Sequence, residues 1–164
     1  MKTLLLLRHA KSSWSQVNQS DHDRSLNARG KRDAPRMGQL LKSQGLIPDL
    51  ILSSTAKRAR KTTQRVVAGG ELAVPVEELR AFYLAPPDTY VEVLQQQNGA
   101  VDCILVVGHN PGIQELSRKL TGQDKSFPTG TLAQVELDIR QWGELSLDTR
   151  GSLRNIWYPR QLES

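Results

Sequence analysis

The chain has 164 residues, of which 38% are hydrophobic and 24% charged, so residues 1–164 are expected to form one globular domain around a single core. These values exclude a collagen-like, disulfide-rich or wholly disordered chain. The net charge is +5, but residues 1–65 carry a net charge of +10 and residues 66–164 a net charge of −5. The basic part predicts an anionic partner, either a polyanion such as nucleic acid or a small phosphorylated group.

The lengths of the apolar runs and the number of cysteines indicate the cellular compartment and exclude some kinds of metal site. No apolar run approaches the roughly 18 residues of a membrane span, and Leu4–Leu7 is too short for the apolar core of a signal peptide. We therefore expect a cytoplasmic protein with no membrane partner. The single cysteine, Cys103, excludes an internal disulfide and a cysteine-based zinc site, and its apolar neighbours predict a buried position.

Short apolar runs alternate with segments of helical periodicity along the chain. In chain order, we expect a strand at 3–7, a helix at 29–44, a strand at 50–52, a helix at 56–68, a strand at 75–76, a helix at 86–96, a strand at 103–107, a helix at 111–120 and strands at 131–139 and 144–147. The last two strands would form a hairpin around Gly143. This order predicts an α/β fold, a three-layer sandwich with a mainly parallel central sheet, an antiparallel edge and helices on both faces.

Histidine and arginine side chains follow the expected strands at the point where each strand ends. Arg8 and His9 follow the first strand, Arg58 comes shortly after the second, and His109 follows the strand at 103–107. Because ligands of such sheets bind beyond the carboxyl ends of the strands, these side chains are expected to meet at one edge. One histidine at a strand end is more often structural, but two at equivalent ends beside arginines favour a functional site.

The second expected helix begins with an excess of positive charge. Lys57, Arg58, Arg60 and Lys61 lie in its first turns, where cations oppose the helix dipole by about 0.3–1 kcal/mol each. An anion bound at this helix N-terminus would turn that cost into a gain, and the arginine fork matches phosphate oxygens two at a time. The alternative is a solvated basic face. Lys57, Arg60 and Lys61, together with Lys11, are the predicted basic collar of a phosphate pocket.

Three sequence motifs at these strand ends resemble those of the histidine phosphatase superfamily, which has the phosphoglycerate-mutase-like fold. They are Leu7-Arg8-His9-Ala10, Ser53-Ser54-x-Ala56-x-Arg58-Ala59-x-x-Thr62 and Val107-Gly108-His109-Asn110-Pro111-Gly112. Their order and spacing match over nearly the whole chain. Within this superfamily, the chain resembles the SixA-type phosphohistidine phosphatases in its short length and in three further motifs. These motifs are Lys11-Ser12-Ser13-Trp14, Asp21-x-Asp23-Arg24-x-Leu26 and Phe127-Pro128-Thr129-Gly130.

The resemblance implies a role for each residue at the strand ends. His9 would be the nucleophile that attacks phosphorus and forms a phosphohistidine intermediate, with its other ring nitrogen donating to a fixed acceptor. Arg8 and Arg58 would hold the phosphoryl oxygens, and His109 would be a further donor, favoured as imidazolium by the phosphoryl dianion. Cationic donors of this kind stabilise the transition state without a metal, so we expect neither a metal nor another cofactor.

Further residues are candidates for binding the substrate. Arg24 is the next expected phosphate contact, with a surface arginine as the alternative, and Asn110 and Ser12 are expected to line the pocket unless they serve as caps or in turns. Trp14 lies either at the pocket rim or packed on the scaffold. Only about 20 residues separate Ala10 from the next helix, so little chain is available for a lid. The pocket is therefore expected to be shallow and open to a protein surface.

One residue of the family pattern is missing. Many members place a general-acid glutamate after a Leu-Arg pair, whereas the equivalent pair of this chain is followed by Ala81. Asp21, Asp23, Glu77 and Glu78 are the alternative donors. A weak donor matters less for a phosphoramidate, whose leaving nitrogen can be protonated before cleavage, than for an alkyl phosphate. The missing glutamate therefore favours phosphohistidine in a protein as the substrate.

Three other functions stay open at this point. A general small-molecule phosphomonoesterase of the same fold would use the same residues. A non-catalytic phosphoprotein-binding module would also use them, although it would not need the nucleophile His9. A nucleic-acid-binding domain fits the basic charge, but the aromatic content is only 5% and no nucleic-acid-binding motif is present, so we expect no nucleic acid partner.

Overall fold

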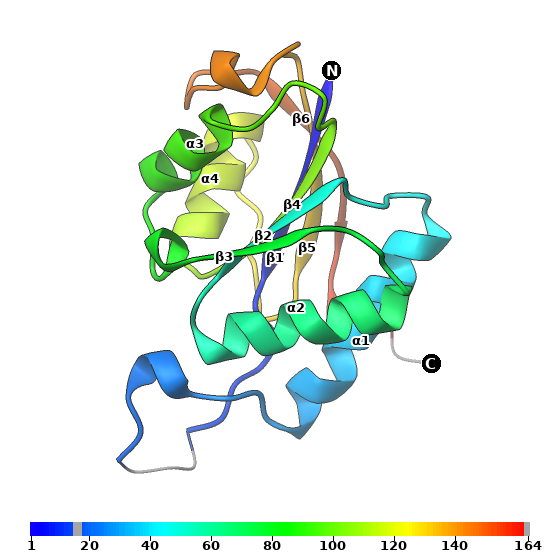
Figure 1. The fold of residues 1–164 in the computed structure, drawn as a ribbon, viewed down its shortest axis with the longest axis vertical. Helices are drawn as coiled ribbons and strands as arrows, with labels where there is room; N and C mark the ends of the chain where they lie inside the picture. The colour runs from blue at the N-terminus through cyan, green and yellow to red at the C-terminus, as the bar shows by residue number, and fades with distance from the viewer. Residues whose placement is uncertain (15–17, 163–164) are drawn as a thin grey trace.

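The computed structural model describes residues 1–14 and 18–162, and within them a six-stranded sheet forms the centre (Figure 1). The order across the sheet is β3-β2-β4-β1-β5-β6. The strands are β1 Lys2–Arg8, β2 Leu50–Ser54, β3 Val76–Leu79, β4 Cys103–Gly108, β5 Leu132–Leu137 and β6 Gly151–Trp157. The first four run parallel, whereas β5 runs antiparallel to β1 and β6 antiparallel to β5. The mainly parallel sheet with an antiparallel edge is confirmed.

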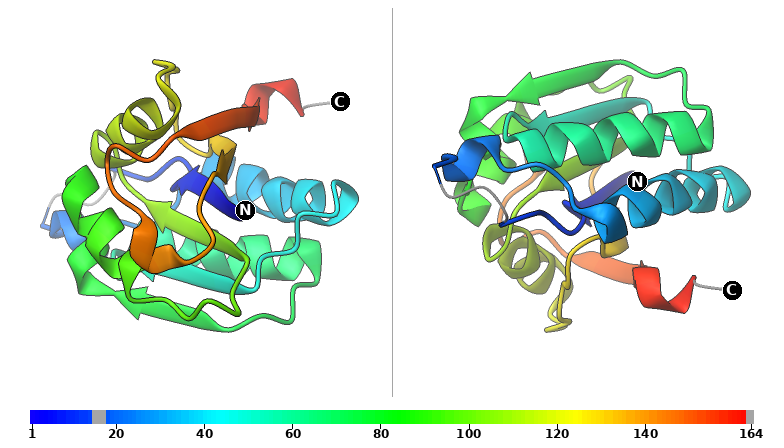
Figure 2. Two further views of the ribbon diagram at one scale, coloured as in Figure 1. Left: turned by 90° about the horizontal axis from the view of Figure 1, so that it is seen from above. Right: turned by 90° about the horizontal axis from the view of Figure 1, so that it is seen from below.

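Four helices of the described chain cover the two faces of the sheet (Figures 1 and 2). They are α1 Ala28–Ser43, α2 Lys57–Gly70, α3 Pro87–Gln95 and α4 Gly112–Thr121. Helices α1 and α2 pack on one face and α3 and α4 on the other, so each face has its own hydrophobic cluster. The predicted three-layer α/β sandwich is confirmed. Short 3-10 turns are η1 Asp21–Asp23, η2 Arg80–Phe82, η3 Trp142–Glu144 and η4 Pro159–Gln161.

Strand β1 shows why the N-terminal apolar run is continuous. Every side chain from Leu4 to Leu7 is fully buried, because β1 lies in the middle of the sheet between β4 and β5. Leu4 and Leu6 pack on the side of α3 and α4, whereas Leu5 and Leu7 pack on the side of α1 and α2. A strand covered by helices on both faces has no polar face, so its sequence shows no alternation.

The predicted strand at 144–147 is wrong. These residues begin in η3 and continue as a loop, and the strand that pairs with β5 is β6, which starts later. Leu145 is buried and its carbonyl accepts a hydrogen bond of 2.7 Å from Gln95 of α3, while Trp142 Nε1 donates to the Val101 carbonyl at 2.7 Å. The apolar residues of this segment therefore cover the C-terminal end of α3 and form no strand.

Helix α2 has no side-chain N-cap, although three hydroxyl residues, Ser53, Ser54 and Thr55, come shortly before it. Its N-cap is Ala56, which makes no side-chain cap bond. Ser54 Oγ instead accepts a hydrogen bond of 3.1 Å from the N–H of Ala56, the residue before the helix begins. The basic first turn of α2 therefore begins without a capping carboxylate or hydroxyl.

The described residues also bear on the exclusions made from composition. None of their helices is both long enough and apolar enough to cross a membrane. Cys103 is half-buried at the start of β4 and has a free thiol, so it is less enclosed than its apolar neighbours predict. Near the other end of the chain, Trp157 and Leu162 pack against the cluster beneath α1 and α2.

Helices α1 and α2 approach each other where only glycine fits. A Cβ atom on Gly38 would lie 2.0 Å from the carbonyl oxygen of Val66, and one on Gly69 would lie 2.3 Å from the carbonyl oxygen of Pro35. Both distances are far inside van der Waals contact with backbone atoms, and a packed interior has little room to yield. The two glycines therefore set the spacing of the helices and, with it, the position of the first turn of α2.

Gly38→Ala is expected to lower the free energy of unfolding by about 1–3 kcal/mol, because the added methyl group forces the two helices apart. In an unobstructed helix the same change would stabilise the fold by up to about 1 kcal/mol, so the sign of the effect is informative. Gly143→Ala is the control, since its Cβ would meet only the Gln95 carbonyl oxygen at 3.9 Å. Urea unfolding followed by circular dichroism measures both, and wild-type stability of Gly38→Ala would contradict the close contact.

Candidate active site

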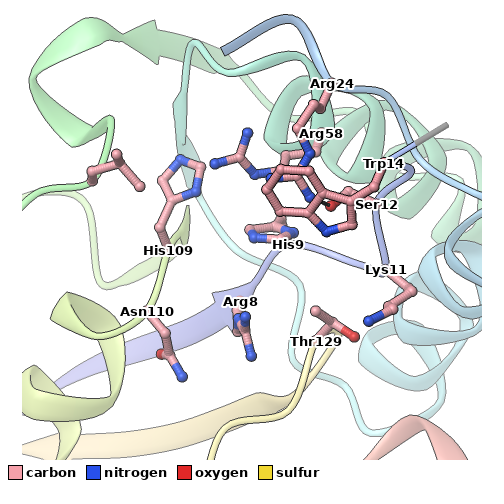
Figure 3. A pocket seen from close by; sticks show the side chains of 11 residues that line it. Arg8, His9, Lys11, Ser12, Trp14, Arg24, Arg58, His109, Asn110 and Thr129 are labelled. Atoms are coloured by element: carbon pink, nitrogen blue, oxygen red, sulfur yellow. Dashed lines mark hydrogen bonds between the residues drawn. The ribbon is translucent and has the colours of Figure 1, made fainter. Parts of the chain in front are cut away.

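A small pocket opens at the carboxyl ends of β1 and β4, beside the first turn of α2 (Figure 3). Its volume is about 200 Å³. Among the described residues that line it, four are arginine or lysine and none is acidic. The lining residues are Arg8, His9, Lys11, Ser12, Trp14, Arg24, Arg58, Leu84, His109, Asn110 and Thr129. Its size and charge suit a phosphoryl group better than a whole metabolite.

The four residues predicted to act on the phosphoryl group meet in this pocket. Arg8 and His9 lie at the end of β1, His109 follows β4, and Arg58 reaches in from α2 (Figure 3). His9, Arg58 and His109 are 6%, 3% and 1% exposed, and the two imidazole centroids lie 5.2 Å apart. The parallel register, with Arg8 opposite Gly108, brings the two histidines to the same edge of the sheet.

A backbone carbonyl holds His9 in one tautomer. Its Nδ1 lies 2.8 Å from the Ala10 carbonyl oxygen, which can only accept, so Nδ1 carries the ring proton and Nε2 presents a lone pair. The Ala10 N–H donates to Thr62 Oγ1 at 2.9 Å, which anchors that residue to α2. Burial, together with the charges of Arg58 and Arg8, lowers the pKa of His9 to about 3. The ring is therefore neutral at pH 7.

His109 is also neutral beside the guanidinium groups. Burial and the charge of Arg58 lower its pKa to about 3. Its Nε2 lies 2.8 Å from Ser54 Oγ, whereas its Nδ1 is buried without a hydrogen-bond partner. The expected imidazolium therefore depends on the dianion, which would have to outweigh both burial and the neighbouring arginine.

The carboxylate of Asp21 links two arginines of the pocket. Its Oδ1 accepts from Arg24 Nη1 at 2.8 Å and its Oδ2 from Arg58 Nη2 at 3.0 Å, and the Tyr83 hydroxyl donates to Oδ2. Arg58 Nη1 also donates to the Asp21 carbonyl at 2.6 Å. Burial by itself would raise the pKa of Asp21, but the bonds from Tyr83, Arg24 and Arg58 outweigh it and hold the pKa well below its usual range.

Neither of the predicted general acids, Asp21 and Glu78, is available as a proton donor in the pocket. Asp21 is ionised at any working pH, because its pKa is so strongly lowered. Glu78 lies on β3, where its Oε2 is 3.8 Å from Arg60 Nε, and both residues line a different cavity between α2 and β3. Asp23 is exposed, and hydrogen bonds from neighbouring side chains lower its pKa as well. None of these three is suited to donate a proton to a leaving group.

Arg24 and Ser12 line the pocket and contact each other. Arg24 Nη2 donates to Ser12 Oγ, and its Nε donates to the Ser13 carbonyl at 3.1 Å. The Arg24 guanidinium carbon lies 3.3 Å from the ring centroid of Trp14, which is 74% exposed. Trp14 therefore lies at the pocket rim, where it holds Arg24 through a cation–π contact.

Three buried polar atoms without a partner surround the pocket. Arg8 Nη1 and Asn110 Nδ2 both donate to the Phe127 carbonyl, at 2.9 and 3.0 Å. Arg8 Nε, Asn110 Oδ1 and His109 Nδ1, in contrast, are buried with no hydrogen-bond partner among the described residues. Buried polar groups are normally satisfied, so this gathering of unsatisfied atoms indicates a polar ligand.

The predicted basic collar is only partly present. Lys11 lines the pocket, whereas Arg60 lines the cavity beside β3, and Lys57 and Lys61 line a separate cleft. A helix turns each successive residue by about 100°, so one residue of such a run faces a given side. Arg58 is the residue of α2 that faces the pocket.

Two side chains that support the pocket were not among the predicted site residues. Ser54 bonds to His109, and Tyr83 bonds to Asp21. The Tyr83 ring also meets the His109 ring edge-on, with centroids 5.6 Å apart. Tyr83 comes two residues after Ala81, the position at which the family pattern has its general-acid glutamate. This closeness in the sequence is a signal that could have identified Tyr83.

Solved structures with this fold include SixA proteins. The SixA protein of Agrobacterium tumefaciens is 32% identical, with a TM-score of 0.82 over 96% of this chain and 98% of that chain. A protein histidine phosphatase SixA complexed with tungstate is 25% identical, with a TM-score of 0.84 over 98% of this chain and 99% of that chain.

Sequence comparisons agree with the structural ones. A chloroplast protein of Arabidopsis thaliana is 34% identical over 152 residues, which cover 87% of this chain and 70% of the relative. A protein of Mycobacterium leprae is 31% identical over 156 residues, which cover 87% of this chain and 94% of the relative. The family model of the histidine phosphatase superfamily (branch 1) matches residues 4–82. The chain belongs to the histidine phosphatase superfamily, in its SixA-type branch, and is a phosphatase.

Proposed function

We propose that this phosphatase removes phosphoryl groups from phosphohistidine in proteins, with His9 as the nucleophile. The observation that carries the proposal is a neutral His9 ring, protonated on Nδ1 and free at Nε2, in a basic pocket. The unpartnered Arg8 Nε and His109 Nδ1 would meet phosphoryl oxygens there, together with the guanidinium of Arg58. The SixA structure with tungstate, a tetrahedral oxyanion, supports such a ligand.

The reaction would proceed in two displacements. In the first, His9 Nε2 forms a bond to phosphorus while the bond from phosphorus to the substrate nitrogen breaks, and the electron pair stays on the substrate imidazole. His9 keeps its Nδ1 proton and becomes a phosphoimidazolium, whose positive charge the Ala10 carbonyl stabilises. In the second, water attacks phosphorus, the electron pair returns to Nε2, and inorganic phosphate leaves with both protons of the water.

The lack of a carboxylic acid donor supports phosphohistidine over alkyl phosphates. No carboxyl group is found among the described residues that line the pocket, and Asp21 beside it is ionised. An alkoxide needs a proton as it departs, whereas a histidine protonated on its other ring nitrogen leaves as neutral imidazole. A volume of about 200 Å³ also suits a phosphoryl group presented by a protein surface. A small-molecule phosphomonoesterase remains the alternative for the same pocket.

A phosphohistidine peptide is expected to be hydrolysed with a higher kcat/KM than glucose 6-phosphate or glycerol phosphate, because its leaving group needs no acid. Release of inorganic phosphate measures all three. His9→Ala is expected to lose activity by on the order of 10³-fold or more while still binding phosphate. Hydrolysis of the sugar phosphates without action on the peptide would overturn the substrate, and full activity of His9→Ala would overturn the nucleophile.

Asp21→Asn is expected to lower kcat by on the order of 10- to 100-fold, because Arg24 and Arg58 lose the carboxylate that orients them. Since Asp21 is ionised and donates no proton, the basic limb of the pH profile of kcat/KM is expected to stay in place. Asp23→Asn is the matched control. Because the Asp23 carboxylate contacts Ser20 and His22, this variant is expected to leave kcat unchanged. Loss of the basic limb in Asp21→Asn would identify a general acid instead.

Acid is expected to destabilise the fold through its two buried neutral histidines. His9 and His109 have a folded-state pKa of about 3 against 6.5 in the unfolded chain, so below pH 6.5 the unfolded state binds more protons and stability falls as the pH falls. At pH 5 each histidine accounts for a loss of about 2 kcal/mol. Urea unfolding at pH 7 and pH 5 measures the difference. His109→Gln is expected to remove about half of it, and an unchanged difference would exclude His109 as a cause.

A further inference from the structure

A second cleft lies beside the catalytic pocket, and all of its charged side chains are basic. Its volume is about 290 Å³. Lys57, Lys61 and Arg65 follow one another at intervals of four residues along α2, and Lys31 faces them from α1. Figure 2 shows these two helices side by side in the right-hand view. We call this site the basic cleft; its lining is completed by Ser25 and Leu26.

The cations of the basic cleft have no acidic partner. None of the ion pairs between described residues includes Lys31, Lys57, Lys61 or Arg65. Lys61 Nζ donates to Gln64 Oε1 at 3.4 Å, and Arg65 Nη1 to the Lys31 carbonyl at 3.4 Å.

This charge is unfavourable for the isolated fold. Like charges four residues apart destabilise a helix by about 0.2–0.5 kcal/mol per pair, and Lys57 also opposes the helix dipole. The exposed carboxylate of Asp23 is close enough to feel the charge of Lys57, but it bonds to Ser20 and His22. Folding alone therefore gives no reason for this cluster, whereas a bound anion does.

The linings of the basic cleft and of the catalytic pocket adjoin at two places in the chain. Arg24 lines the catalytic pocket and the next residue, Ser25, lines the basic cleft. In the same way, Arg58 lines the pocket and the preceding residue, Lys57, lines the cleft. Because residues of the two linings are neighbours in the chain at both places, the two sites adjoin, and a protein surface of ordinary interface size that brings a phosphoryl group to His9 would be large enough to reach the cleft.

We propose that the basic cleft binds glutamate and aspartate side chains of the protein that carries the phosphoryl group. The proposal rests on the proposed function, because it assumes that the phosphoryl group arrives on a protein. In the part of the chain that the structure describes, no aromatic side chain lines the cleft, so these residues offer no surface on which nucleic acid bases could stack. Acidic side chains beside the phosphorylated residue would meet four unpaired cations, which would speed encounter and orient the substrate.

A binding experiment tests the cleft without catalysis. The probe is a fluorescent peptide with four glutamates and no phosphate, titrated with the full chain at low salt and followed by anisotropy. Lys61→Glu/Arg65→Glu is expected to weaken its binding by on the order of tenfold or more. Arg150→Glu/Arg154→Glu changes the net charge equally at exposed residues outside the cleft, and is expected to bind the probe like wild type.

Three results of that titration would overturn the proposal. They are no binding of the peptide to wild type, equal weakening in the two double variants, and tighter binding of a single-stranded RNA of the same charge through Lys61 and Arg65. The last result would assign the cleft to nucleic acid.

A kinetic experiment links the basic cleft to catalysis and separates it from the proposed function. Two phosphohistidine peptides are compared, one with acidic and one with neutral residues beside the phosphohistidine. Wild type is expected to favour the acidic peptide in kcat/KM by on the order of tenfold, and Lys61→Glu/Arg65→Glu to lose that preference through KM while still hydrolysing the neutral peptide. An unchanged preference in the variant would overturn docking in the cleft. Failure to hydrolyse either peptide would overturn the proposed function, while the binding titration still decides the fate of the cleft.

Discussion

The hydrogen bond from His9 Nδ1 to the Ala10 carbonyl determines what the pocket can do. It takes up the single proton of a neutral imidazole, so it leaves Nε2 free to attack, and it would stabilise the positive charge of a phosphorylated ring. The bond depends on β1, which carries His9 to the sheet edge, and on α2, where Thr62 anchors Ala10. The spacing of α2 from α1 in turn depends on the contact at Gly38.

The site combines neutral imidazoles, positively charged arginines and one negatively charged carboxylate. Both imidazoles stay neutral, because burial beside guanidinium groups disfavours any further positive charge. Arg8, Arg24 and Arg58 supply the positive charge around them, and Asp21 supplies a negative charge behind two of these arginines. Phosphoryl transfer relies on positioning and electrostatics, and this division provides both without a proton donor at the leaving group.

Features that follow from strand topology could be predicted from the sequence, and features that depend on distances between remote residues could not. Parallel strands end at the same edge of a sheet, so the sequence predicted that His9 and His109 lie close together. The segment 144–147 has the alternation of a strand, but its apolar residues pack against α3. The ionisation of Asp21 is set by Arg58 and Tyr83, which are 37 and 62 residues away in the chain.

The pairing of Asp21 with Arg58 has a consequence for turnover. A phosphate that reaches Arg58 meets a guanidinium whose positive charge is already partly balanced by the Asp21 carboxylate bonded to it. The nearby negative charge weakens the net attraction for an anion, so inorganic phosphate is held less tightly than by an unpaired arginine. A carboxylate that stays bonded behind the arginine in this way favours product release, the step that returns the site to its starting state.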